Sequence, residues 1–172
     1  MPLDLTDATI VFDLDGTLVD TAPDLTAATN HVFGQIGLAP VAPRDLHSLI
    51  SRGSRAMIEE GLRLHGVTKS EDAITELHKL FLPYYAENVA VLSLPYDGIP
   101  ALLDTLSQAG ARLAVCTNKF EALSKALLRQ LDLDHRFAVI AGRDTFDVFK
   151  PAPGHLIRTI EMEIGRASCR ER

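Results

Sequence analysis

Two carboxylates separated by a single residue carry the strongest chemical signal in this sequence. Asp13 and Asp15 follow the apolar run of residues 8–12 and precede Gly16 and Thr17. Two anions this close repel each other and favour a bound cation, and Mg²⁺ takes one or two carboxylates together with water and substrate phosphate. With that charge screened, one carboxylate can attack phosphorus while the other handles the proton of the leaving group.

The residues around this pair support the same chemistry. Gly16 lets the backbone approach a phosphate closely, and its neighbours can offer N–H donors. The competing interpretation is a pair of turn or helix-capping aspartates. The position directly after a buried apolar run, and before Gly-Thr, favours the catalytic interpretation over the capping one.

Three later residues would complete a phosphate site. Thr117 and Asn118 end the apolar run that starts at Arg112, and Lys150 precedes Pro151. Ligands of parallel sheets bind at the carboxyl ends of the strands, where these side chains would converge with the two aspartates. The Thr117 hydroxyl can hold a phosphoryl oxygen or cap the following helix, and both interpretations stay open. Lys150 can supply a point charge, although a lone lysine before proline is commonly just solvated.

The elements that must position these residues alternate in type. Strand patterns at 8–12, 112–117 and 137–141 are separated by helical patterns, whereas residues 20–90 show only helical spacing. This rhythm predicts an α/β fold, a Rossmann-like parallel sheet core with an inserted helical cap domain. We expect the core to comprise residues 1–19 and 91–162, the cap to comprise 20–90, and 163–172 to be a non-native tail.

Composition limits the class of protein. The chain has 172 residues, 47% of them apolar, which suits one domain with an insert. Its net charge of −6 argues against nucleic acid as the main partner, because binding to a phosphate backbone needs clustered Lys and Arg. No apolar run approaches the roughly 18 residues of a membrane span, and the acidic start lacks a secretory signal. Two cysteines make no disulfide framework. We therefore expect a cytoplasmic protein whose partner is a small phosphorylated metabolite, with no nucleic acid and no membrane; the oligomeric state does not follow from the sequence.

Three segments together resemble the signatures of the haloacid-dehalogenase-like superfamily of phosphotransferases. They are residues 13–17 (DLDGT), residues 115–118 (VCTN) and Lys150-Pro151. The resemblance spans residues 8 to about 160 and, within the superfamily, is closest to the phosphoglycolate phosphatases. It implies the same fold, with the helical segment after the first signature acting as the cap that closes over substrate.

The resemblance also implies roles for individual residues. Asp13 would be the nucleophile that becomes an aspartyl phosphate, and Asp15 would protonate the leaving alcohol and then activate water. The Asp13 side chain and the Asp15 backbone carbonyl would bind Mg²⁺. The phosphoryl group and substrate would be held by the following residues: Gly16, Thr17, Thr117, Asn118, Lys150, and Arg52 or Arg55 of the cap. For the two arginines a solvated helix start is an equally good interpretation.

Other functions fit parts of the pattern. A sugar phosphomutase or a pyrophosphatase would use the same scaffold, and cap residues would decide between them. A non-catalytic, receiver-like phosphate-binding module also clusters acids, a threonine and a lysine at strand ends, but it lacks the long helical insert. Rapid turnover of a small phosphate ester would separate an enzyme from such a module.

The end of the sequence departs from the family pattern. Residues 164–172 resemble a translated sequencing adapter, and no acidic fourth signature, which would complete the metal site, follows Lys150. We therefore expect a truncated core, with the C-terminal part missing and the strand at residues 10–12 left as an exposed edge. Such a chain would be barely stable and inactive.

Overall fold

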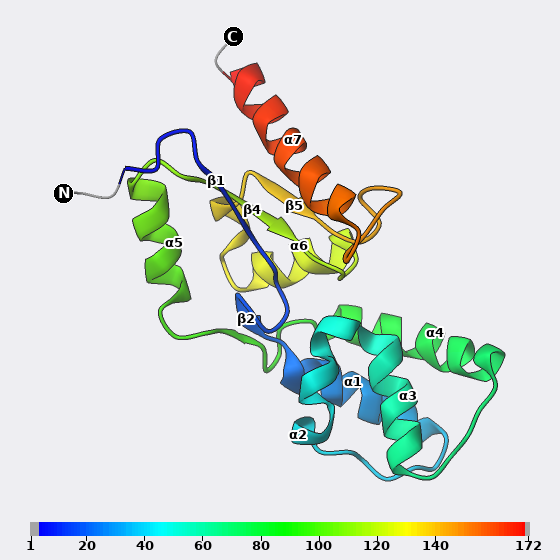
Figure 1. Cartoon of the computed structure of the whole chain (residues 1–172). Helices are drawn as coiled ribbons and strands as arrows, with labels where there is room; N and C mark the ends of the chain where they lie inside the picture. Colours follow the sequence, from blue (N-terminus) through cyan, green and yellow to red (C-terminus); the bar gives the residue numbers. More distant parts are fainter. Residues whose placement is uncertain (1–3, 171–172) are drawn as a thin grey trace. The chain divides into compact units, whose positions relative to one another are not determined.

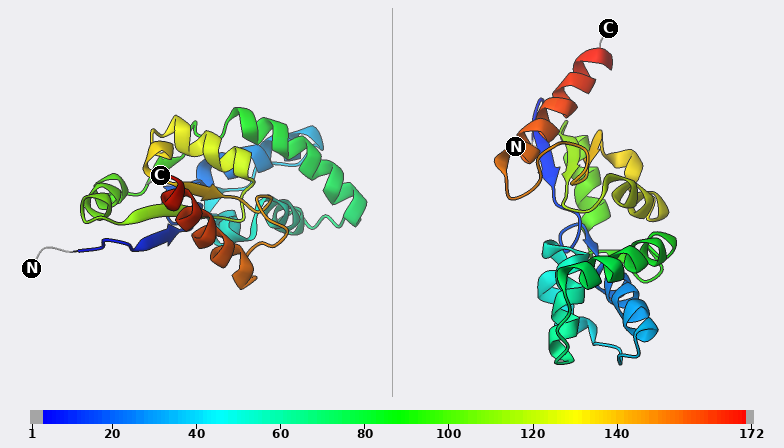
Figure 2. Two further views of the ribbon diagram at one scale, coloured as in Figure 1. Left: turned by 90° about the horizontal axis from the view of Figure 1, so that it is seen from above. Right: turned by 90° about the vertical axis from the view of Figure 1, so that its right-hand side faces the viewer.

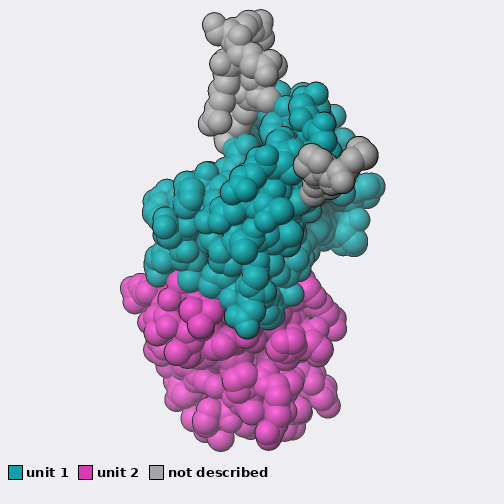
Figure 3. Space-filling view, turned by 90° about the vertical axis from the view of Figure 1, so that its left-hand side faces the viewer, with its two compact units in different colours: residues 1–19, 95–172 teal, residues 20–94 magenta. Residues whose placement is uncertain are grey.

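The chain is divided into two compact units. The computed structural model describes residues 4–170, with side chains as far as residue 165. Unit 1 consists of Met1–Val19 and Pro95–Arg172, and unit 2 of Asp20–Leu94 (Figure 3). Within residues 4–170, no helix combines the length and apolar character needed to cross a membrane.

A three-stranded parallel sheet forms the centre of unit 1 (Figure 1). Its strands are β1 (Thr9–Phe12), β4 (Arg112–Cys116) and β5 (Val139–Ala141), in the order β1-β4-β5. Phe12 lies opposite Val115, and Cys116 opposite Ala141, so all three strands end at the same edge of the sheet. The loops that follow the strands therefore leave the sheet side by side.

The burial of the strands follows from this order. From Leu113 onward every residue of the central β4 is buried, as expected for a parallel strand covered on both faces. All four residues of β1 are only partly buried, and in the described part of the chain β1 has a strand neighbour on one side only. The edge position expected for this strand is therefore seen.

Helices cover both faces of the sheet. Helix α6 (Glu121–Gln130) packs on β5, and α7 (Pro153–Arg170) lies on the opposite face, where it contacts all three strands (Figure 2). Helix α5 (Ile99–Gln108) contacts β4. Leu103 of α5 and Leu127 and Leu128 of α6 are the buried leucines of these helices. The predicted α/β core with a parallel sheet is confirmed.

Helix α7 extends further than the apolar spacing indicates. The regular pattern weakens after Met162, yet the helix continues to Arg170 because each added residue costs little once a helix has formed. Glu163, which we expected to begin the non-native tail, is instead buried, at 1% exposure. It accepts a hydrogen bond from Thr9 Oγ1 at 2.8 Å and lies 3.1 Å from Arg112 Nε. Glu163 is thus part of the packed unit; residues 171–172 of the expected tail lie outside the described residues.

Unit 2 is helical. Phe33, Met57, Ile58, Phe81 and Tyr85 form its buried interior. The helices are α1 (Ala22–Gln35), α2 (Pro43–Leu46), the 3₁₀ helix η1 (His47–Arg52), α3 (Ser54–Leu64) and α4 (Glu71–Glu87). At Gly61, α3 packs tightly on α1, because a Cβ at this position would lie 2.3 Å from the Phe33 ring.

Two local details of unit 2 concern how its helices begin. Residues 43–52 form a short α-helix followed by a 3₁₀ helix. Thr21 occupies the N-cap position of α1, but its hydroxyl makes no capping hydrogen bond; Asp20 Oδ1 accepts one from Ala22 N at 3.2 Å instead. Asp20 therefore satisfies one of the backbone donors at the start of α1.

The chain passes between the units at two short strands, β2 (Val19–Asp20) and β3 (Leu94–Pro95), which pair with each other. The sequence analysis did not predict these strands because two residues are too few to show a period of alternation. Inside unit 2, the buried Asp24 carboxylate accepts hydrogen bonds from Leu92 N, Ser93 N and Ser93 Oγ. This carboxylate fixes the segment that leads into β3.

Candidate active site

The loop after β1 is folded tightly onto itself. Leu14 O accepts hydrogen bonds from the N–H groups of Thr17, Leu18 and Val19, and Gly16 N donates to Val19 O at 2.9 Å. Gly16 has φ +76°, a left-handed conformation that L side chains rarely adopt, so glycine is required for this turn. Leu14 is fully buried and anchors the loop between the two aspartates.

This geometry changes what Gly16 and Thr17 can offer a ligand. The N–H of Thr17, one of the neighbours of Gly16 that we expected to donate to a phosphate, donates inside the loop to Leu14 O, and Gly16 N donates to Val19 O. Gly16 therefore contributes the turn itself. At Thr17 the exposed side-chain hydroxyl is the group left for a ligand, and phosphate binding by either residue stays a prediction.

Each aspartate has a lysine of its own. Lys150 Nζ lies 2.8 Å from Asp13 Oδ1, and Lys119 Nζ lies 2.8 Å from Asp15 Oδ1. The second pair is the more enclosed one, with side chains 6% and 12% exposed against 30% and 36% for the first. The two pairs join the loop after β1 to the loops after β4 and β5. Two neighbouring anions that would repel each other are each neutralised by a cation from another loop.

Lys119 is a site residue that the sequence analysis did not single out. It stands two positions after Thr117, at the end of the same strand, and that position was the available signal. From the sequence alone, a lysine just before a helix can equally be a solvated surface residue. In the structure Lys119 forms a buried ion pair with Asp15, so it is a residue of the site.

Thr117 and Asn118 hold the loops together. The buried Thr117 hydroxyl accepts a hydrogen bond from Lys119 N at 3.1 Å, so it orders this loop and does not cap α6, whose N-cap position is Phe120. Asn118 Nδ2 donates to Lys150 O at 3.2 Å. Its Oδ1 is buried without a hydrogen-bond partner among the described residues. Asn118 thereby positions the backbone of the lysine that pairs with Asp13.

The donor set fits Mg²⁺ only with help from substrate and water. In the part of the chain that the structure describes, no group of three or more His, Cys, Asp or Glu side chains is assembled that could hold a metal. Asp13 uses Oδ1 for both Lys150 Nζ and its hydrogen bond from Leu14 N, while Oδ2 has no protein partner within the described residues. One carboxylate oxygen, with the Asp15 backbone carbonyl that the family resemblance implies as a second ligand, would suit a metal that keeps several waters and takes substrate phosphate as a ligand.

The turn after β5 is locked against the start of α6. A Cβ at Gly142 would lie 2.2 Å from Glu121 N, so a side chain has no room there. Gly142 N donates to Thr145 Oγ1, Asp144 Oδ1 accepts from Glu121 N, and Arg143 N donates to Lys119 O, all at 2.8 to 3.0 Å. These bonds fix the backbone of Lys119 relative to the sheet.

Two buried titratable groups lie behind the site. The side chain of His155 is fully buried, and this burial lowers its pKa. Its Nε2 lies 3.1 Å from Gly142 O and must carry the proton, because a carbonyl oxygen only accepts. Burial likewise raises the pKa of the Cys116 thiol, as expected for an unreactive cysteine inside a strand.

The two arginines expected to bind a substrate carboxylate both lie in unit 2. Arg55 already pairs with two carboxylates of its own unit, Glu59 at 3.1 Å and Glu71 at 2.5 Å. Arg52 is the last residue of η1. A role for either arginine in substrate binding stays a prediction, and for Arg55 it would require exchange of these partners.

Known proteins resemble this chain over most of its length. The sequence profile of the family described as "Haloacid dehalogenase-like hydrolase" matches residues 10–165. A phosphoglycolate phosphatase of Agrobacterium fabrum is 46% identical over 88% of this chain and 65% of its own length. Another, of Mesorhizobium japonicum, is 44% identical over 92% of this chain and 70% of its own length. The chain thus spans about two thirds of the length of these curated relatives.

Solved structures give the same answer for the fold. A crystal structure described as a "predicted phosphoglycolate phosphatase" of Haemophilus somnus superimposes with a TM-score of 0.80 at 26% identity, covering 91% of this chain and 71% of the other. One from Lactobacillus delbrueckii superimposes with a TM-score of 0.76 at 27% identity, covering 94% and 73%. From the match to residues 10–165, and from these relatives, the chain belongs to the haloacid dehalogenase-like hydrolase family.

Proposed function

We propose that the site of unit 1 carries out Mg²⁺-dependent hydrolysis of a small phosphate monoester, with 2-phosphoglycolate as the first candidate, through an aspartyl-phosphate intermediate. The observation that carries this proposal is the pairing of Asp13 with Lys150 and of Asp15 with Lys119 at 2.8 Å, where three strands end together. Two carboxylates held one residue apart, with a cation for each, suit a reaction in which one attacks phosphorus and the other moves a proton.

The nucleophile is prepared by its surroundings. Lys150 Nζ and Leu14 N both contact Asp13 Oδ1, which orients the carboxylate and leaves Oδ2 to attack. The Lys150 ammonium offsets negative charge as the phosphate dianion approaches the carboxylate. A bound Mg²⁺ would supply further charge stabilisation at the phosphoryl oxygens.

The phosphoryl group is then transferred in two steps, first to Asp13 and then to water, and Asp15 moves a proton in each. In the first, Asp15 acts as the carboxylic acid, having taken up one proton from solvent when the substrate binds: the bond from Asp13 Oδ2 to phosphorus forms, the bond to the ester oxygen breaks, and Asp15 gives this proton to that oxygen. In the second, Asp15 takes a proton from water, whose oxygen attacks phosphorus, and Asp13 leaves as a carboxylate with release of inorganic phosphate. Thr117 and Asn118 would bind phosphoryl oxygens beside Lys150, and Thr17 would do so through its exposed hydroxyl.

The names of the relatives support a substrate with a carboxylate. Several are phosphoglycolate phosphatases, and one, of Pseudomonas aeruginosa, is an N-acetylmuramic acid 6-phosphate phosphatase that is 36% identical. Both named substrates are phosphate monoesters of an acid. We therefore extend the proposal to carboxylate-bearing phosphate monoesters as the substrate class.

Two measurements test the proposal separately. Fluorine NMR with Mg²⁺ and beryllium fluoride, a mimic of the aspartyl phosphate, should show a bound species with the chain and with Asp132→Asn, but none with Asp13→Asn. Asp132 is a suitable control because its side chain is 98% exposed. Phosphate release from 2-phosphoglycolate should depend on both Mg²⁺ and Asp13. Capture of the fluoride without any turnover would instead support the non-catalytic phosphate-binding module.

A further inference from the structure

Arg143 is held on two aromatic rings and has no acidic partner. Its guanidinium carbon lies 4.8 Å from the centre of the Phe149 ring and 5.6 Å from that of Phe120. Among the described residues no carboxylate forms an ion pair with it, whereas Arg136 and Arg158 of the same unit each pair with an aspartate. An uncompensated cation on a prepared support is a feature that the proposed phosphoryl chemistry does not use.

The two rings lie against the guanidinium and leave its N–H groups as the means of binding. The N–H groups of an arginine lie in the plane of the guanidinium, so a ring over its face does not block them. Two of these N–H groups form a fork that matches the two oxygens of a carboxylate. Arg143 is exposed, and Phe149 is 46% exposed, so a ligand can reach this fork.

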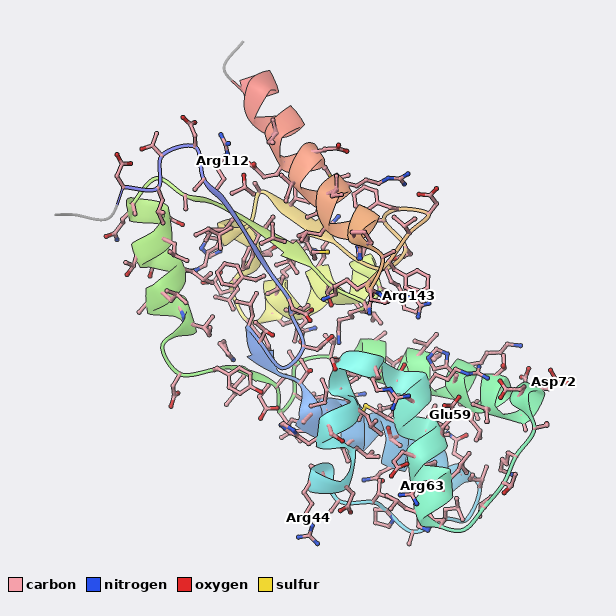
Figure 4. All side chains as sticks on the ribbon, viewed as in Figure 1. Arg44, Glu59, Arg63, Asp72, Arg112 and Arg143 are labelled. Carbon is pink, nitrogen blue, oxygen red and sulfur yellow. The ribbon has the colours of Figure 1, made fainter. Side chains whose placement is uncertain are left out.

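Arg143 is also tied to both lysines of the site. Its backbone N donates to Lys119 O at 3.0 Å, and Lys119 holds Asp15. Phe149, which supports its guanidinium, directly precedes Lys150, the partner of Asp13. Figure 4 shows Arg143 by the loop between β5 and α7, the loop that carries Lys150. The unpaired cation therefore belongs to the edge of the sheet where the phosphoryl group would bind.

We propose that Arg143 is a specificity-determining residue that binds the carboxylate of the substrate while the phosphoryl group occupies the Asp13 and Lys150 site. This inference rests on the proposed function, and it places the carboxylate-binding cation in unit 1, not at Arg52 or Arg55. A ligand with a phosphate monoester and a carboxylate is held at two points, and an analogue that lacks the carboxylate is held at one.

Calorimetric titration with two matched ligands tests the assignment without requiring turnover. The ligands are 2-phosphoglycolate and 2-hydroxyethyl phosphate, in which a hydroxymethyl group replaces the carboxylate. Each is titrated with Mg²⁺ into proteins that all carry Asp13→Asn, so that neither ligand is hydrolysed during the measurement. Arg143→Gln should weaken 2-phosphoglycolate binding by about tenfold or more, because a charge-assisted bidentate contact is lost. It should leave 2-hydroxyethyl phosphate binding within about twofold. Arg143→Lys, which keeps the charge and loses the fork, should fall between.

The control is Arg129→Gln, which removes an exposed arginine that pairs with Asp134 on the same unit; it should change neither affinity. Equal weakening of both ligands by Arg143→Gln, or unchanged 2-phosphoglycolate binding, would overturn the role of Arg143 and leave the proposed function standing. If the parent chain binds neither ligand, the proposed function fails and this inference fails with it. Should Arg143→Gln lose the circular dichroism of the parent, the comparison is made with Arg143→Lys.

Discussion

Lys119 Nζ lies 2.8 Å from Asp15 Oδ1, and this ion pair is almost closed off from solvent, with side chains 6% and 12% exposed. The pair joins the loop after β1 to the loop after β4. Removing one member of such a pair leaves an uncompensated charge in a poorly solvated place, whereas removing both does not. The pair is therefore expected to matter both for the site and for the stability of unit 1.

A double-mutant cycle measures that coupling. Lys119→Met alone should destabilise the chain more than Lys119→Met combined with Asp15→Asn, with a coupling free energy of about 1–3 kcal/mol. Urea unfolding of the four proteins gives the number. The exposed pair Lys79 and Glu76 serves as the reference, for which a coupling below about 0.5 kcal/mol is expected. If the changes in unfolding free energy at Lys119 and Asp15 were additive, the two side chains would not be energetically coupled as an ion pair.

A substitution at Gly142 tests whether the close packing of the turn after β5 against α6 stabilises the chain. Gly142→Ala would place a Cβ 2.2 Å from Glu121 N, a backbone atom that cannot move without disturbing α6. We expect destabilisation of about 1–3 kcal/mol, together with weaker capture of the phosphate mimic, because Lys119 is held by the same turn. Gly34→Ala is the control, since nothing lies within 4 Å of its Cβ position in α1. There alanine should be neutral or stabilising by about 0.5–1 kcal/mol, as measured by urea unfolding.

The meeting of Asp13 with Lys150 could be predicted from the sequence, and the meeting of Asp15 with Lys119 could not. Strand patterns fix which residues follow the strands, and the carboxyl ends of parallel strands share one edge of the sheet. Which of two nearby lysines turns to which carboxylate depends on side-chain directions across separate loops. Those directions are set by backbone bonds such as Arg143 N to Lys119 O, which leave no pattern in the sequence.

Glu163 illustrates a different limit of sequence reasoning. Its assignment to a tail followed from the unusual composition around it, yet Thr9 and Arg112, far away in the chain, make it part of the core. A buried glutamate is compatible with the interior only when it is paired, and the partner is not visible from local composition. The α/β class could be predicted from the sequence because it depends on long periodic segments. The contact of Glu163 with Thr9 and Arg112 depends on single residues far apart in the chain, which leave no periodic pattern.

The importance of Glu163 can be measured against a neighbour on the same helix. Glu163→Gln removes the charge that pairs with Arg112 and should destabilise the chain by about 1.5–3 kcal/mol, the range for hydrogen bonds to a charged group. Glu161→Gln changes an exposed position of α7 and should stay within about 0.5 kcal/mol. Urea unfolding monitored by circular dichroism gives both values. If both substitutions changed the free energy of unfolding equally and by less than about 0.5 kcal/mol, Glu163 would not contribute to the packed unit and would behave as part of a tail.

The buried His155 predicts how stability changes with pH. Burial lowers the pKa of His155 in the folded chain, while in the unfolded chain it titrates near 6.5. Between these two pKa values the unfolded chain binds more protons than the folded one, so stability falls as pH falls below about 6.5. The contribution is fully present above the unfolded pKa. Nearby Lys150 pushes the His155 pKa in the same direction as burial, and Asp13 opposes it.

Unfolding free energies at pH 7.5 and pH 5.5 measure this loss, and His155→Gln should reduce the difference between the two pH values. His135→Gln serves as the reference substitution, because the side chain of His135 is 58% exposed. The glutamine at position 155 can still donate to Gly142 O, so the variant separates the titration from the hydrogen bond. An unchanged pH difference in His155→Gln would mean that another group controls stability in this range and that His155 is protonated equally in both states.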